Sequence, residues 1–168
     1  MWRTTIIECI NQEAEFIFGF LIFNFPTARI FMGDVGSQFL GYGFAALAVI
    51  AAEYDASRTS LLIIPLLFFN FIFDVTFTFF RRLAAGGDVT RAHRGHLYQL
   101  LNRSGVSHVR VSLLHFAVTA AQGAGALVLI GIETQYRILL FTPYVAFQVV
   151  YAIAVIRMAA ARGLLDAD

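Results

Sequence analysis

The sequence predicts an all-α protein: a polytopic bundle of transmembrane helices with about four full spans and a partial helix at its N-terminus. Of its 168 residues, 59% are hydrophobic and 14% are charged, whereas soluble domains are about 45–50% apolar and about 25% charged. The mean hydropathy is +0.74. Because one membrane helix needs about 20 apolar residues, we expect residues 1–168 to form a single membrane domain.

The N-terminal stretch has a mixed pattern. Residues 1–15 combine charged and apolar side chains without the compact apolar core of a signal peptide. The apolar run from Phe16 to Phe25 is too short to cross a bilayer, and Pro26 terminates it. We therefore expect this run to be the end of a membrane helix whose beginning is missing or altered.

Four longer apolar runs are expected to span the membrane. Pro65 is expected to kink the second of them. The four runs cover residues 37–52, 59–80, 110–131 and 138–156.

Two polar residues, Asn70 and Asp74, interrupt the second run. They lie one helical turn apart and share a face, so we expect them to point into the bundle rather than toward lipid. Two interpretations stay open. Either the residues pair with each other or with a neighbouring helix, or they act near an active site.

The distribution of arginine predicts the orientation in the membrane. If Arg29 and the polar segment 81–109 face the cytoplasm, the same side receives both arginines of the C-terminal tail, while the opposite turns hold only Arg58 and Arg137. The formal net charge is +1, which gives no indication of a nucleic-acid partner.

The first candidate site lies in residues 24–41, N-F-P-T-A-R-I-F-M-G-D-V-G-S-Q-F-L-G. Its one carboxylate, Asp34, lies between Gly33 and Gly36, and glycines allow tight turns and close approach of a ligand. A charged group at the edge of a membrane span is a functional candidate, and a carboxylate suits Mg²⁺ shared with substrate phosphates. The alternative is a turn in which Asp34 caps the helix that follows.

The second candidate site is the histidine loop within residues 81–109, with the motif A-H-R-G-H-L-Y-Q. His93 and His96 would share a face if this stretch is helical, with Arg94 and Tyr98 beside them. Histidine can bind a metal, move protons or contact phosphate oxygens. The alternative is a solvated basic loop that touches lipid headgroups.

Two further histidines, His108 and His115, have no partner at a useful spacing, so we expect structural roles for them. The predicted orientation places Asp34 and the histidine loop at the same face of the membrane. An acid for Mg²⁺ and a basic loop for phosphate together predict a diphosphate site, and a lipid substrate would explain its place at a membrane surface.

The first motif resembles the signature of the polyprenyl-phosphate N-acetylhexosamine-1-phosphate transferases, or glycosyltransferase family 4. The motif H-R-G-H-L-Y-Q resembles the branch that initiates O-antigen and similar polysaccharides. The resemblance covers about residues 16–156 and corresponds to the C-terminal half of the family's chain. It implies a multi-pass protein of the bacterial inner membrane whose active face is cytoplasmic.

The resemblance also implies a reaction. A UDP-linked N-acetyl amino sugar gives its sugar-1-phosphate to undecaprenyl phosphate, with UMP as the second product and Mg²⁺ as the cofactor. By correspondence with the family's motifs, Asp34 would bind the metal, and Asn24 and Phe31 would hold the uracil, Phe31 by stacking. The histidine loop would contact the diphosphate and the sugar through His93, Arg94, His96 and Tyr98.

The sequence departs from the family in one respect that concerns activity. The family's N-terminal half carries an adjacent aspartate pair and an Asn/Asp-Gly motif, and neither occurs in these residues. We therefore expect a truncated chain that is inactive alone unless another chain, such as a second copy in a homo-oligomer, completes the site. The alternative is a non-catalytic membrane bundle that binds a lipid phosphate or another subunit.

Overall fold

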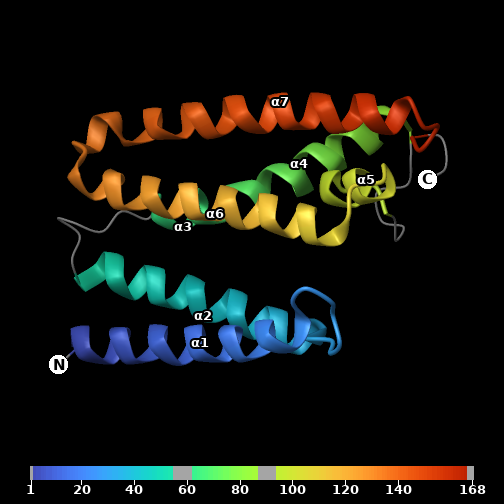
Figure 1. The fold of residues 1–168 in the computed structure, drawn as a ribbon. Helices are drawn as coiled ribbons and strands as arrows, with labels where there is room; N and C mark the ends of the chain where they lie inside the picture. Colours follow the sequence, from blue (N-terminus) through green and yellow to red (C-terminus); the bar gives the residue numbers. More distant parts are fainter. Residues whose placement is uncertain (1, 55–61, 87–93, 166–168) are drawn as a thin grey trace. The chain divides into compact units, whose positions relative to one another are not determined.

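The computed structural model describes residues 2–54, 62–86 and 94–165, and within these ranges it contains helices and no strand (Figure 1). The prediction of an all-α fold is confirmed. The chain divides into two compact units, Met1–Ile64 and Pro65–Asp168. Each unit is described by itself below.

The first unit is a pair of antiparallel helices, α1 (Trp2–Asn24) and α2 (Gly33–Tyr54) (Figure 1). The run 16–25 is therefore the second half of α1, and residues 2–15 form the first half of the same helix. Glutamate is a good helix former, so the charged residues of 1–15 obscure the hydropathy pattern without interrupting the helix. One of them, Glu13, packs its carboxylate against Gly43 of α2, where a Cβ would overlap it.

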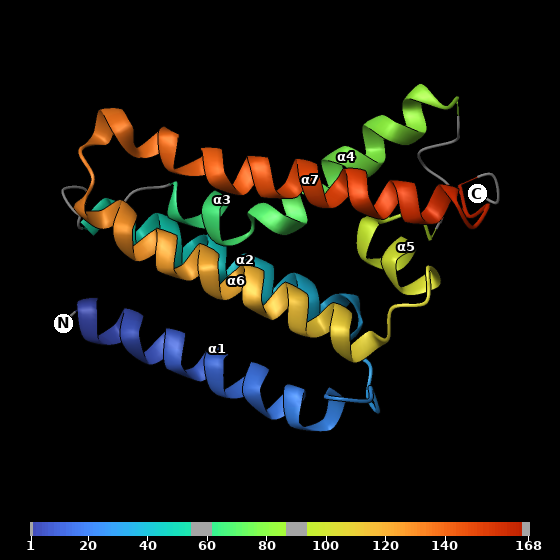
Figure 2. The same ribbon diagram turned by 45° about the horizontal axis from the view of Figure 1, so that its top comes forward.

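The second unit contains the remaining helices. The two longest, α6 and α7, run antiparallel and are joined by the short helix η1, while α4 crosses them and α5 lies near the C-terminal end of α7 (Figures 1 and 2). The bounds are α3 Ile63–Leu67, α4 Phe69–Ala84, α5 Leu97–Arg103, α6 His108–Gly131, η1 Thr134–Leu140 and α7 Phe141–Ala160.

The span expected over residues 59–80 is broken into α3 and α4. Pro65 lies in the first turn of α3, where proline is tolerated, so it does not kink a continuous helix. The break falls after Leu67 instead. The side-chain amide of Gln122 on α6 satisfies the backbone there: in the amide orientation that pairs both of its atoms, it donates to the carbonyl of Leu67 (3.2 Å) and accepts from the N–H of Asn70 (3.0 Å). A buried side chain thus replaces helical bonds that would otherwise be lost inside a membrane.

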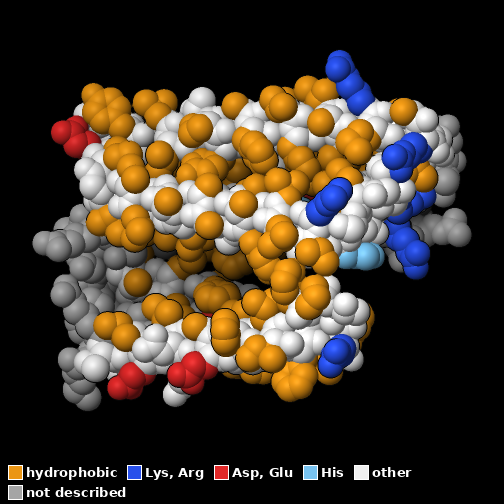
Figure 3. Space-filling view, in the orientation of Figure 1, with side chains coloured by type: hydrophobic (Ala, Val, Ile, Leu, Met, Phe, Trp, Pro, Cys, Tyr) orange, Lys and Arg blue, Asp and Glu red, His pale blue; other side chains and the backbone are white. Residues whose placement is uncertain are grey.

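Three stretches of the described residues are long and apolar enough to cross a membrane: Gly33–Glu53, His108–Gly131 and Thr134–Ala160. Only 6%, 22% and 17% of their most apolar windows are buried within the protein, and apolar side chains cover the visible faces of the long helices (Figure 3). Exposed apolar surface of this extent is typical of helices that face lipid. The chain is therefore a membrane protein, and its described residues contain three continuous candidate spans.

The tightest packing in the second unit lies where α5 meets α7. Its buried residues are Leu97, Leu100, Leu101, Val111, Ala152, Val155 and Ala159. Because three of these residues belong to α5, this short helix is fixed against α7 by apolar burial. The residues that precede α5 are consequently held at one end of the second unit.

Candidate functional site

The loop between α1 and α2 is organised by Asn24, the last residue of α1. Its side-chain oxygen accepts hydrogen bonds from the backbone N–H groups of Arg29 (2.8 Å) and Ile30 (3.0 Å). Both lone pairs of this oxygen are thus used to fold the loop back onto the helix end. A contact between Asn24 and a ligand would therefore come from its amide N–H₂ group.

Phe31 and Asp34 lie near the end of the same loop. The Phe31 side chain is 99% exposed, so its ring offers both faces to a planar ligand. Gly33 has a φ of +69° and begins α2, which places Asp34 in the first helical turn rather than at the cap position. Asp34 is exposed and lies near the positive end of the helix dipole. The Ser37 hydroxyl donates a bond to the Asp34 backbone carbonyl (3.1 Å).

The donor set fits a magnesium ion that is shared with a substrate. Among the residues that the structure describes, no group of three or more His, Cys, Asp or Glu side chains could hold a metal. Mg²⁺ usually takes one or two protein carboxylates and completes its shell with water and substrate phosphates. One exposed carboxylate, Asp34, is compatible with that mode and not with a cage built from protein alone.

The described part of the histidine loop lies in the second unit, and its residues 94–96 are not helical. His93 lies outside the described residues. Arg94 and Gly95 are irregular, and His96 is extended (φ −64°, ψ 150°) directly before α5. His96 therefore does not lie on a helix, so the condition under which His93 and His96 would share a helical face is not met. The helix begins at Leu97 because α5 is capped there, partly by a bond from the His96 N–H to the Gln99 side chain (3.3 Å).

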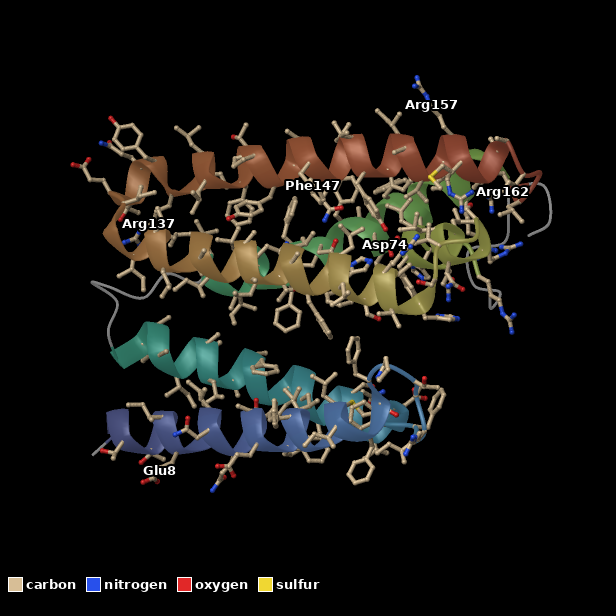
Figure 4. The ribbon with its side chains drawn as sticks, viewed as in Figure 1. Glu8, Asp74, Arg137, Phe147, Arg157 and Arg162 are labelled. Atoms are coloured by element: carbon tan, nitrogen blue, oxygen red, sulfur yellow. The ribbon has the colours of Figure 1, made fainter. Side chains whose placement is uncertain are left out.

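Asp74 of α4 provides the other part of this cap. Its side chain is almost fully buried, and its Oδ1 accepts bonds from the Leu97 N–H (2.8 Å) and the Thr78 hydroxyl (3.1 Å). The same oxygen lies 3.6 Å from Nδ1 of His96. Figure 4 shows Asp74 inside the second unit, near the N-terminal end of α5. Asp74 therefore fixes both the start of α5 and the surroundings of His96.

A second contact ties α4 to the same loop. Arg81 donates a bond from its guanidinium to the carbonyl of Gly95 (3.0 Å), and Gly95 is buried. The loop is thus held to α4 on both sides of His96.

Asn70 continues the polar cluster into the interior of the second unit. It contacts Nδ1 of His115 on α6 (2.6 Å) and accepts a bond from Gln148 on α7 (2.6 Å). Asn70 and Asp74 therefore bond to neighbouring elements rather than to each other. His115 also meets the ring of Tyr98 edge to face, at a centroid distance of 6.4 Å. These side-chain contacts thus connect α4, α6 and α7, and the ring contact extends them to α5.

Arg94 and Tyr98 line a pocket of about 320 Å³ between α5 and the start of α6. The pocket also receives Arg103 and His108, which sequence patterns did not associate with a site. Arg103 donates a bond to the backbone carbonyl of Arg94 (3.2 Å). The only sequence signal for this arrangement is Ser107, whose side chain accepts from the Arg110 N–H (3.5 Å) and marks the start of α6.

The residues predicted to form the site thus fall into two described clusters. Asn24, Phe31 and Asp34 share a loop of the first unit, and Arg94, His96 and Tyr98 lie around the N-terminal end of α5 in the second. Each cluster has the chemistry expected of it: an exposed ring and a carboxylate in one, and basic side chains in the other.

The first of these two clusters lies within a stretch that is similar to a known protein family. The model of glycosyl transferase family 4 matches residues 4–52, a range that includes the first cluster. The match already begins at residue 4, so the similarity to this family includes most of the opening stretch that the sequence pattern left unassigned. The histidine loop lies beyond the matched range.

Several curated proteins are similar to the chain. The probable undecaprenyl-phosphate N-acetylglucosaminyl 1-phosphate transferase of Bacillus subtilis is 37% identical over 97 residues, which cover 57% of this chain and 26% of that protein. The decaprenyl-phosphate N-acetylglucosaminephosphotransferase of Mycobacterium tuberculosis H37Rv is 34% identical over 119 residues, 64% of this chain and 30% of that protein. The phospho-N-acetylmuramoyl-pentapeptide-transferase of Halalkalibacterium halodurans is 49% identical over 55 residues, 31% and 17% respectively.

The chain spans between about a sixth and a third of the length of these relatives. No solved structure matches it.

Proposed function

Because the chain belongs to the superfamily of polyprenyl-phosphate N-acetylhexosamine-1-phosphate transferases, we propose that its two polar clusters serve sugar-1-phosphate transfer from a UDP-N-acetyl amino sugar to undecaprenyl phosphate. The observation that carries the proposal is the loop between α1 and α2. Its backbone is fixed by Asn24, and it presents a fully exposed Phe31 ring close in sequence to the exposed carboxylate of Asp34. A stacking surface and a metal ligand are what a nucleotide diphosphate requires.

The proposed reaction is a phosphoryl transfer. An oxygen of the lipid phosphate bonds to the phosphorus that carries the sugar, and the bond from that phosphorus to UMP breaks. Enzymes promote this chemistry mainly by positioning and by neutralising charge. Mg²⁺ bound through Asp34 would supply charge neutralisation on the diphosphate.

The described residues have separate tasks in this proposal. Phe31 stacks on the uracil, and the Asn24 amide contacts its edge. In the second unit, Arg94 and His96 contact anionic oxygens, since guanidinium and imidazole groups are suited to phosphate, and Tyr98 adds a hydroxyl beside them. His93 keeps its proposed contact with the diphosphate and lies outside the described residues.

We further propose that the chain lies in the bacterial inner membrane with the histidine loop at the cytoplasmic face. In the second unit, Arg157 and Arg162 lie toward the α5 end and Arg137 lies at the opposite end (Figure 4). Arg137 is buried and donates a bond to the Ile132 carbonyl (3.0 Å), so its charge is partly used within the protein. The excess of exposed arginine at the α5 end favours that end for the cytoplasm.

For the sugar, we propose N-acetylglucosamine or a related amino sugar, because the printed names of the Bacillus subtilis and mycobacterial relatives carry N-acetylglucosamine. Initiation of O-antigen and lipopolysaccharide is a narrower proposal that rests on the histidine motif. The names of the Bacillus subtilis and mycobacterial relatives specify a polyprenyl phosphate and N-acetylglucosamine rather than a polymer.

A second candidate function is a non-catalytic bundle that binds lipid phosphate. It is favoured by the sequence given, which carries neither the adjacent aspartate pair nor the Asn/Asp-Gly motif that the resemblance leads one to expect in a catalytic site. A homo-oligomer in which copies complement one another would restore the first candidate.

The test is UMP release by membranes that contain the 168-residue chain, supplied with undecaprenyl phosphate, Mg²⁺ and a panel of UDP-amino sugars. If copies of the chain complete one another's sites, the membranes release UMP, and Asp34→Asn abolishes that release while membrane insertion is unchanged; a chain that is inactive alone releases none. Glu53→Gln, an acid-to-amide change at the far end of α2, is the matched control and should retain release. Release by Asp34→Asn at the wild-type rate would refute the role of Asp34, and no release by the wild type would favour the non-catalytic candidate.

A further inference from the structure

We propose that the groove between α4 and α7 binds an anionic phospholipid, with one acyl chain in the groove and the headgroup at Arg157. The groove has a volume of about 470 Å³, and all of its lining residues belong to the second unit. The proposal requires only that the chain lies in a membrane, so it does not depend on the proposed function.

Apolar side chains of two helices form the groove. Phe73 and Phe77 line it from α4, and their rings stack on each other with a centroid distance of 5.8 Å and an interplanar angle of 7°. The lining residues of α7 are Val149, Ala152, Ile153, Ile156 and Arg157. Ala152 is small and buried, so it leaves room between its larger neighbours. Parallel rings beside this space form a flat wall that suits a chain of methylene groups.

The groove is accessible from the surrounding lipid. Val149 and Ile153, which line it, keep 43% and 48% of their surface exposed. In a membrane such a surface is in contact with lipid chains, because water does not reach the hydrocarbon core. An acyl chain therefore enters this groove from the side, without any opening of the bundle.

The length of the groove matches one leaflet. Arg157 follows Val149 by eight residues on α7, which is about 12 Å along the helix axis. Half of the hydrocarbon core of a bilayer is about 15 Å thick. The groove thus extends from the membrane surface toward the midplane, as a single acyl chain does. A chain as long as that of undecaprenyl phosphate would extend far beyond it.

Arg157 determines the kind of headgroup. It lies near the end of the candidate span Thr134–Ala160 and is exposed, and Figure 4 shows its side chain extending away from the body of the second unit. It is the only charged residue that the described chain contributes to the groove. The stem of an arginine packs on apolar surface while its guanidinium reaches the headgroups, where it forms charge-assisted bonds to phosphate oxygens. A headgroup without its own cation, such as that of phosphatidylglycerol, gains most from this contact.

The experiment is native mass spectrometry of the full chain in a non-ionic detergent, titrated with phosphatidylglycerol or phosphatidylcholine that carry the same acyl chains. We expect the first phosphatidylglycerol to bind about fivefold more tightly than phosphatidylcholine, since one arginine at a membrane surface contributes about this much to the attraction of an anionic lipid. Arg157→Gln should abolish the preference. Arg110→Gln removes an equal charge from an exposed position of α6 that does not line the groove, and it should change the affinity by less than about twofold.

A second pair of variants tests the groove itself. Val149→Trp places a large side chain in the groove and should weaken binding of both lipids. Val150→Trp adds the same side chain at the next residue, which is 66% exposed and does not line the groove, and it should leave binding unchanged. Circular dichroism of all four variants verifies that they remain helical.

Three results would overturn the proposal: equal affinities of the wild type for the two lipids, equal effects of Arg157→Gln and Arg110→Gln, or unchanged binding in Val149→Trp. Undecaprenyl phosphate, added as a competitor at equal concentration, should not displace phosphatidylglycerol; displacement would assign the groove to a polyprenyl lipid and overturn the choice of occupant. The assay contains no nucleotide sugar, so a failure to release UMP would refute the proposed function and leave this site standing.

Discussion

Removing the Asp74 carboxylate should release the start of α5. In Asp74→Ala, the buried N–H of Leu97 loses its acceptor, at a cost of about 1–3 kcal/mol, and the buried Thr78 hydroxyl loses a bond of about 0.5–1.5 kcal/mol. The sum is about 2–4 kcal/mol. Asp74→Asn keeps an acceptor oxygen and loses only the contribution of the charge, about 1 kcal/mol.

Hydrogen exchange measured by mass spectrometry on the chain in nanodiscs tests this prediction. Since about 1.4 kcal/mol corresponds to a tenfold change, exchange of the α5 amides should rise by about 30-fold or more in Asp74→Ala and by about fivefold in Asp74→Asn. Thr76→Ala, an exposed threonine of α4, should leave α5 unchanged. Wild-type exchange in Asp74→Ala, or equal effects of the two Asp74 variants, would show that other contacts hold α5.

Three further substitutions test the packing, each by thermal unfolding in one detergent. Gln122→Leu should lower the stability by about 2–5 kcal/mol, because two backbone groups at the break between α3 and α4 lose their partner; an unchanged melting temperature would contradict the bridge. Gly125→Ala should lower the stability by about 1–3 kcal/mol, since its Cβ would overlap the Tyr144 hydroxyl. Gly123→Ala, at a position of α6 with open space around it, should raise the stability by up to about 1 kcal/mol. A Gly125→Ala variant that is more stable than Gly123→Ala would refute this packing. Gly33→Ala should cost about 1–2 kcal/mol because its φ is +69°, and a neutral result would show that the helix start can adjust.

Hydropathy was sufficient for the all-α fold and for the long spans, because lipid-facing helices carry their apolar pattern in the sequence itself. Hydropathy did not predict features that depend on a residue distant in the sequence. The interruption between α3 and α4 depends on Gln122, which lies far along the chain on another helix. The continuous α1 was missed for the opposite reason, since the acids of residues 1–15 interrupt the apolar pattern while favouring the helix.

In the candidate site, too, local sequence predicts some features, and distant residues determine others. The glycine-flanked acid Asp34 and the loop before it are contiguous in sequence, so a motif could identify them. The start of α5 could not be predicted from the motif, because it is set by Asp74 on α4. Arg103 and His108 share a pocket with Arg94 only because α5 and α6 fold around it, and no spacing rule relates these three residues.

The contacts of Asn70 have a consequence for the alignment of the membrane helices. In lipid, apolar surfaces attract each other with little preference for one longitudinal position, so a helix could shift along its neighbour at small cost. Asn70 meets His115 of α6 and Gln148 of α7, and its own N–H is bridged to α6 by Gln122. Sliding α4 by one helical turn, about 5.4 Å, would break all three contacts together, so this one amide sets the register of three helices.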